Sequence, residues 1–190
     1  MRILFSLLAA LAFAASAVPV RAADDPVHYV QKLVEGMVAV SKKPTAERRA
    51  YYDALLEREV DWNGPAEQAL GARFASLSDD ERGKLADWAR ASVLGYKPLM
   101  RFIQNLVFNS CAISGKHVAE VSQIRFICSR FGADPNFTAR FDVARIGGRF
   151  RIVDIGHIGV SLREELSKEL FQKDAVEEHG VKVDLASLKK

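Results

Sequence analysis

The sequence predicts an α+β fold, in which an antiparallel sheet of about four strands is covered on one face by a mainly N-terminal layer of helices. Apolar residues recur with a helical period over about residues 26–106, and Pro, Gly and capping residues separate the segments. From about residue 107 to residue 154, apolar and polar residues alternate between short turns. Strands joined by short turns are antiparallel, and helices that precede such a sheet pack on one of its faces. We expect further helices at the C-terminus.

Residues 1–22 have the features of a secretory signal peptide. Arg2 gives a positive start, residues 3–18 are almost wholly apolar, and residues 20–22 (Val-Arg-Ala) suit a signal peptidase. The apolar run is short for a bilayer span, which needs about 20 residues, and an uncleaved membrane anchor is the alternative. We therefore expect an exported single domain of residues 23–190.

The charge balance argues against a nucleic-acid partner. The formal net charge of the whole chain is +3. It falls to +1 without residues 1–22, because that segment holds two arginines and no acid. A nearly neutral chain lacks the electrostatic attraction on which binding to a phosphate backbone depends.

Three helices are expected before residue 75. The acids and proline of Asp24–Pro26 open the first helix, and Lys42–Pro44 ends it. A second helix begins at Thr45, and Asn63–Pro65 breaks the chain after it. A short third helix is expected at Ala66–Phe74.

A fourth helix begins at a capping box formed by Ser78 and Glu81. Pro98 is expected to kink or end it. The apolar stripe of this helix and of its continuation includes Leu85, Trp88, Leu99, Phe102 and Leu106.

The strand region contains alternating runs separated by turn residues. In the first run Ile124, Phe126 and Cys128 share one face, and residues 137–144 form a second run that includes Phe141 and Val143. Turns are expected at Ala133–Asn136 and at Ile146–Gly148.

The last expected strand begins at Arg149. Phe150 and Ile152 point to one face, and Arg149, Arg151 and Val153 point to the other. Glycines then lead into a closing helix, Ser161–Lys173, which opens with a capping box formed by Ser161 and Glu164, and a short terminal helix is expected at Val183–Leu188.

The two cysteines, Cys111 and Cys128, are expected to form a disulfide, because export places them in an oxidising compartment. A tight hairpin at Ser114–Gly115 would not place them opposite each other. The bridge would then need a longer or bent connection, or a helical end before the strand.

An enzyme is the main alternative class. Asp154 and His157 are near neighbours in the sequence, and a cysteine could act as a nucleophile. No nucleophile elbow or oxyanion motif precedes either cysteine. The histidines lack metal-ligand spacing with one another or with cysteine. We expect no catalytic site, no metal and no cofactor.

Residues 151–162, RIVDIGHIGVSL, resemble the W-x-V-x-D-V-x-x-x-G-V-S-L signature near the C-terminus of the MlaC (toluene-tolerance) family of periplasmic lipid carriers. Asp61-Trp62 followed by Ala69–Phe74, Leu77–Arg82 and the tail from Gly180 to Leu188 resemble further family segments in the same order. Phe74 and Phe150 stand where the family usually has Trp. Asp154 matches the signature Asp, for which a structural role at the turn is expected.

The resemblance implies a non-catalytic phospholipid-binding protein of the periplasm. Such a protein shuttles lipid between the outer membrane, where a lipoprotein is its partner, and an MCE-type ABC transporter of the inner membrane. This transport maintains outer-membrane lipid asymmetry and solvent tolerance. The alternatives are a carrier of hopanoid or another lipid, and an envelope adaptor whose cavity has collapsed.

A soluble carrier must enclose the lipid tails, because each CH₂ group exposed to water costs about 0.8 kcal/mol. An apolar cavity between the sheet and the helices after Ser78 would meet this requirement. An ordinary packed core is the other interpretation of the same residues. The residues expected to line the cavity are Leu85, Trp88, Leu99, Phe102, Leu106, Phe126, Phe141, Val143 and Ile152.

Arginines gather in the strand region. They are expected on a solvated outer face of the sheet, or on a basic surface that meets anionic lipid heads or an acidic docking surface of a membrane partner. They are Arg125, Arg130, Arg140, Arg145, Arg149 and Arg151.

Overall fold

The computed structural model of the protein describes residues 25–97, 100–101, 105–118, 120–130, 133–157 and 159–172. The expected signal peptide, Leu99, Phe102 and the expected helix Val183–Leu188 lie outside these residues. The elements, in chain order, are α1 (Pro26–Ser41), α2 (Thr45–Glu59), α3 (Gly64–Leu70), the 3₁₀ helix η2 (Gly71–Ser76), α4 (Asp79–Gly95), β1 (Phe108–Val118), β2 (Val121–Arg130), β3 (Ala133–Ile146), β4 (Arg149–His157), β5 (Val160–Ser161) and α6 (Leu162–Gln172).

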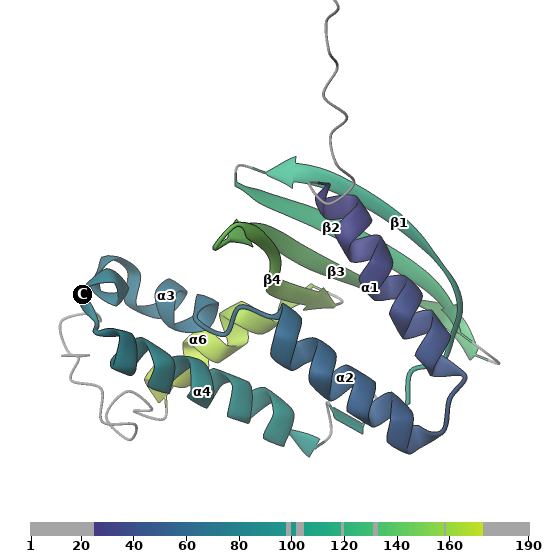
Figure 1. Ribbon diagram of the computed structural model, residues 1–190, viewed down its shortest axis with the longest axis horizontal. Helices are drawn as coiled ribbons and strands as arrows, with labels where there is room; N and C mark the ends of the chain where they lie inside the picture. The colour runs from purple at the N-terminus through teal and green to yellow at the C-terminus, as the bar shows by residue number, and fades with distance from the viewer. Residues whose placement is uncertain are drawn as a thin grey trace, which may run out of the picture.

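The α+β fold is confirmed. One antiparallel sheet has the strand order β1-β2-β3-β4-β5, and α1 crosses its face while α2, α4 and α6 lie together beside it (Figure 1). The sheet has five strands instead of about four, because the two residues of β5 pair with the end of β4. No described helix combines the length and the hydrophobicity that a membrane span requires.

Helices α1 and α4 begin at the residues that their capping signals predict, whereas α3 begins at Gly64, two residues before the expected start at Ala66. The Asp25 side chain accepts a hydrogen bond from the Val27 amide at 2.9 Å. Both hydrogen bonds of the Ser78–Glu81 capping box are present at the start of α4. The expected helix Ala66–Phe74 is instead divided into α3 and η2, because Gly71 has a φ of +54° and interrupts the α-helical backbone.

The strands form a meander of hairpins. Gly147 and Gly148 connect β3 to β4 with φ values of +57° and +80°, as a two-residue type I′ turn requires. The expected turn at Ala133–Asn136 is wrong, because β3 begins at Ala133 and that residue pairs with Arg130. Pairing with β2 therefore extends β3 through residues whose composition is typical of a turn.

A β-bulge changes the alternation in β4. Asp142 pairs with Asp154 and Val143 pairs with Ile152, so Val153 is the extra residue. Phe150 and Ile152 face the helices as predicted, but Val153 is buried and does not face solvent with the neighbouring arginines. The strand bends sharply in this region (Figure 1).

The core lies between the sheet and the helical layer. Its largest fully buried side chains include Tyr52 from α2, Leu85 from α4 and Phe126 from β2. Helix α1 approaches β1 so closely that a Cβ atom at Gly115 would lie 2.8 Å from Val27 Cγ2. Gly115 therefore permits close helix–strand packing and does not form a hairpin turn.

Candidate functional site

Seven of the nine residues expected to line a cavity belong to one buried apolar cluster. The other two, Leu99 and Phe102, lie outside the described residues. All seven have relative exposures of 8% or less, and in the described structure they lie in one hydrophobic core. They are Leu85, Trp88, Leu106, Phe126, Phe141, Val143 and Ile152.

Aromatic rings of the sheet form much of the inner surface of this cluster. The Phe126 and Phe141 rings meet edge to face, with centroids 4.8 Å apart. Phe137 lies 6.2 Å from Phe126 and 5.4 Å from Phe108. Phe108 and Phe137 were not among the nine predicted residues, although Phe137 shares the alternation of Phe141.

The cluster borders an open groove between α4 and α6 with a volume of about 620 Å³. Buried Val93 and Leu166 are among its lining residues, together with Leu162. Tyr96 also lines the groove and is 58% exposed. The sequence did not predict this groove, although Leu162 and Leu166 have the i, i+4 spacing of one helix face.

A second hollow of about 540 Å³ adjoins the first and shares Ala91 and Ser92 with it. Trp88 lines this second hollow. Of the nine predicted residues, Trp88 therefore connects the buried cluster to a surface depression on α4.

Asp154 has a structural role at the corner where β4 leads into α6. Its Oδ1 accepts hydrogen bonds from the backbone amides of Ile155 at 2.8 Å and Arg163 at 2.9 Å. The Arg163 Nε donates to the Gly64 carbonyl oxygen at 3.0 Å, which joins the same corner to α3. Ser161 accepts from the Glu164 amide at 3.0 Å, as the predicted cap of α6 requires.

His157, which was also considered for catalysis, makes structural contacts too. His157 Nδ1 donates to the Thr138 carbonyl oxygen at 2.6 Å, and its ring stacks on Phe137 with centroids 4.9 Å apart.

The Arg140 guanidinium forms ion pairs with two carboxylates, that of Asp142 at 2.6 Å and that of Asp154 at 3.4 Å. Burial raises the pKa of Asp142, and the Arg140 charge opposes that shift. Among the described residues, no group of three or more His, Cys, Asp or Glu side chains is placed to hold a metal ion.

The predicted disulfide between Cys111 and Cys128 is present. The two residues lie directly opposite each other in the β1–β2 ladder, with Cα atoms 4.0 Å apart. The expected obstacle does not exist, because β1 continues through Ser114–Gly115 and the strands are connected by residues 119–120. Both thiols are used in the bridge, so neither is a nucleophile in this structure.

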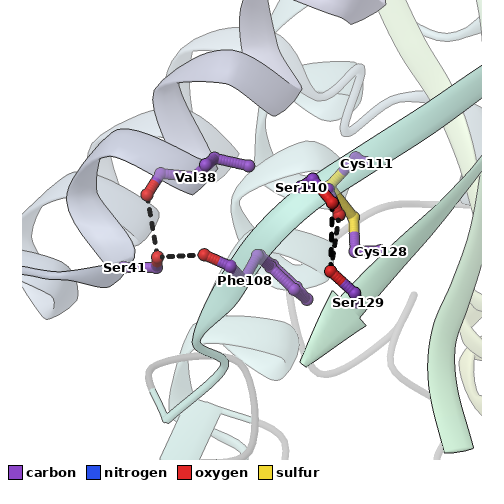
Figure 2. The surroundings of a disulfide bond; sticks show 7 residues. All are labelled: Val38, Ser41, Phe108, Ser110, Cys111, Cys128 and Ser129. Atoms are coloured by element: carbon purple, nitrogen blue, oxygen red, sulfur yellow. Dashed lines mark hydrogen bonds between the residues drawn. A yellow bond between two sulfur atoms is a disulfide. The ribbon is translucent and has the colours of Figure 1, made fainter. Parts of the chain in front are cut away.

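Hydroxyl groups surround the bridge (Figure 2). The Ser41 Oγ lies 2.8 Å from the Val38 carbonyl oxygen and 3.0 Å from that of Phe108, which fixes the end of α1 on β1. The hydroxyls of Ser110 and Ser129 are 3.1 Å apart across the two strands. The disulfide therefore lies near hydrogen bonds that join α1 to β1 and β1 to β2.

Comparison with known proteins defines the fold. The chain matches no protein-family model and no curated protein sequence. Its structure is similar to that of a phospholipid-binding protein from Ralstonia solanacearum, which was determined in complex with a phospholipid. The TM-score is 0.59 at 16% sequence identity, and the match covers 87% of this chain and 99% of the other. The two proteins therefore share an α+β fold over nearly the whole length of the Ralstonia protein.

Proposed function

We propose that this protein is a non-catalytic lipid carrier of the periplasm. The observation that carries the proposal is the fold shared with a phospholipid-binding protein over 99% of that protein's length. The four sequence segments that resemble the MlaC family support the same function. In this proposal, residues 1–22 direct export and are removed.

The carrier exchanges phospholipid between the outer membrane and an MCE-type ABC transporter of the inner membrane. An outer-membrane lipoprotein is its partner at the other end of the route. This exchange maintains lipid asymmetry and solvent tolerance. These assignments follow from the family resemblance.

The lipid tails bind between the sheet and α4. The buried cluster supplies apolar side chains from both layers, including Phe141 from β3 and Leu85 from α4. The groove between α4 and α6 is the entrance, because it borders the cluster and its volume of about 620 Å³ is in the range of small-molecule binding pockets. The polar head stays at the mouth of the groove in contact with water.

A non-catalytic envelope adaptor on the same fold is the second candidate. It is favoured by the close packing of the seven described cluster residues, whose relative exposures do not exceed 8%. An adaptor needs no cavity between the layers, whereas a carrier must separate these side chains to admit a tail.

Native mass spectrometry of protein purified from the periplasm distinguishes the two functions. A carrier retains lipid of defined mass, and an adaptor is lipid-free. Phe141→Arg places a charge in the buried cluster, where it has no partner, so lipid is excluded or the fold is lost. Ser92→Trp fills the groove without burying a charge, and we expect it to stay folded by circular dichroism while lipid retention falls.

Ile127→Arg is the matched control. It adds the same side chain to the opposite face of the sheet, where Ile127 is 43% exposed. It should retain as much lipid as the wild type. Wild-type protein without lipid would refute the carrier function, and full retention in folded Phe141→Arg and Ser92→Trp proteins would refute the proposed site.

A further inference from the structure

We propose that the free edge of β1 binds an extended segment of a partner protein, with apolar side chains on one face of that segment and acidic side chains on the other. This interaction surface is separate from the proposed lipid site and does not depend on lipid binding. Its three parts are an unpaired strand edge, an apolar groove beside it and a basic face behind it.

The first part is the edge itself. Strand β1 (Phe108–Val118) is at the end of the sheet, and within the described structure it pairs only with β2 (Figure 1). Most of its side chains are exposed from Asn109 onward. The outward backbone amides and carbonyls of such an edge bond either to water or to another strand. An added strand would gain main-chain hydrogen bonds with little sequence dependence.

The second part is a groove of about 510 Å³ between α1 and β1. Val34, Val38, Cys111 and Ile113 supply apolar lining, and Glu35 also borders the groove. Cys111 and Ile113 point to the helix-covered face, because they pair with buried Cys128 and Phe126. Alternate side chains of an added strand would point to this same face, so those residues should be apolar.

The third part is the charge on the other face of the sheet. The register places Lys116 opposite Gln123, and Ser114 opposite Arg125, on this outer face. Lys116 and Arg125 are exposed and form no ion pair with the described residues, whereas Arg140, opposite Arg125, is held by Asp142 at 2.6 Å. An added strand would lie about 10 Å from β2. The Arg125 side chain can reach an acidic side chain of the added strand at that distance, because the Ser114 side chain between them is small.

These charges favour a partner segment over a second copy of this chain. Two copies paired through β1 would bring two basic outer faces together, and like charges across paired strands are unfavourable. Strand β1 also contains no acidic residue to compensate them. An acidic outer face on the added strand satisfies both Lys116 and Arg125.

The test uses a fluorescein-labelled ten-residue peptide that alternates valine and glutamate. We expect it to bind the intact protein in fluorescence anisotropy and to slow hydrogen exchange of the β1 amides. A peptide of the same composition, with its valines and glutamates grouped in two blocks, should bind weakly, since it cannot present one apolar and one acidic face. A valine–lysine alternating peptide should also bind weakly.

The variant Lys116→Glu/Arg125→Glu should weaken binding of the valine–glutamate peptide about three- to tenfold, the range expected for two exposed ion pairs. It should strengthen binding of the valine–lysine peptide. The control Lys97→Glu/Arg149→Glu changes the net charge equally at exposed sites outside β1 and should have little effect.

The proposal would be overturned by no binding to the wild type or by equal binding of the block peptide. Slowed exchange outside β1 only, or equal loss of affinity in both double variants, would also overturn it. A dimer that protects β1 without peptide would assign this edge to a second copy. Retained lipid in native mass spectra, with none of the expected peptide binding, would leave the carrier function intact while refuting the docking surface.

Discussion

Replacing Asp154 tests whether the corner between β4 and α6 holds the fold together. The Asp154 side chain is 9% exposed, and its Oδ1 accepts two backbone hydrogen bonds, from Ile155 at 2.8 Å and from Arg163 at 2.9 Å. Asp154→Ala leaves both amides without this acceptor and leaves Arg140 with one carboxylate fewer. A hydrogen bond to a charged group contributes about 1.5–3 kcal/mol, so we expect a loss of about 3–5 kcal/mol.

That loss is a large part of the stability of an ordinary domain, which is about 5–15 kcal/mol. Urea unfolding followed by circular dichroism measures it. With a slope near 2 kcal/mol per molar urea, the midpoint should fall by about 2 M. Asp154→Asn keeps an acceptor oxygen and removes the charge, so it should cost less, about 1–2 kcal/mol.

Glu57→Ala is the matched control for these measurements. Glu57 is also an acid in an ion pair, 3.0 Å from Arg90, but its side chain is 61% exposed. Removing it should cost less than about 1 kcal/mol. If Asp154→Ala costs no more than Glu57→Ala, the two amide hydrogen bonds do not stabilise this corner and our interpretation of Asp154 is wrong.

Three further predictions concern stability. Ser78→Ala removes the cap of α4 and should cost about 1 kcal/mol in urea unfolding, because the Glu81 amide loses its acceptor. Replacing Cys111 and Cys128 by serine should cost about 2–4 kcal/mol without changing the circular dichroism spectrum of the folded state. Burial raises the pKa of Asp61, so the folded state binds that proton more tightly than the unfolded state. Wild-type stability should therefore rise relative to Asp61→Asn as the pH falls from 7 toward the ordinary Asp pKa near 4.

Each of these predictions has an outcome that would contradict it. Ser76→Ala removes an exposed serine hydroxyl outside the cap, and an equal effect of the two serine variants would mean that the capping box does not stabilise α4. Equal stability of oxidised wild type and the double serine variant would show that the bridge is dispensable. A stability difference for Asp61→Asn that does not change with pH, or that favours the wild type at high pH, would show that the Asp61 pKa is not raised.

The features that the sequence predicted correctly depend on neighbouring residues. Ser78 caps α4 because Glu81 lies three residues later, and Gly147–Gly148 turns because glycine adopts positive φ at no steric cost. Two features that it predicted wrongly depend on distant pairing. The bulge at Val153 and the start of β3 at Ala133 are set by the register with adjoining strands, which composition does not specify.

In the candidate site, too, local features were predicted correctly and features that depend on distant elements were not. Apolar identity and spacing predicted the burial of Leu85, Phe126 and Phe141, and the structure places them in one cluster. The same pattern could not show whether such residues enclose a cavity or close on one another, because the answer depends on the separation of two layers. The groove between α4 and α6 was missed since it requires Val93 and Leu166, on helices distant in sequence, to lie side by side.

The strict order of the strands affects how the chain acquires its structure during synthesis. Only two residues connect each strand to the next, so the hairpins can form one after another with little loss of chain entropy. The helices are different, because α1 and α2 emerge first but pack on strands that come later, and α3 packs on α6. The Pro65 carbonyl, for example, receives its hydrogen bond from Ser167, 102 residues further on. We expect pulse-labelled hydrogen exchange to detect protected strands before protected helices.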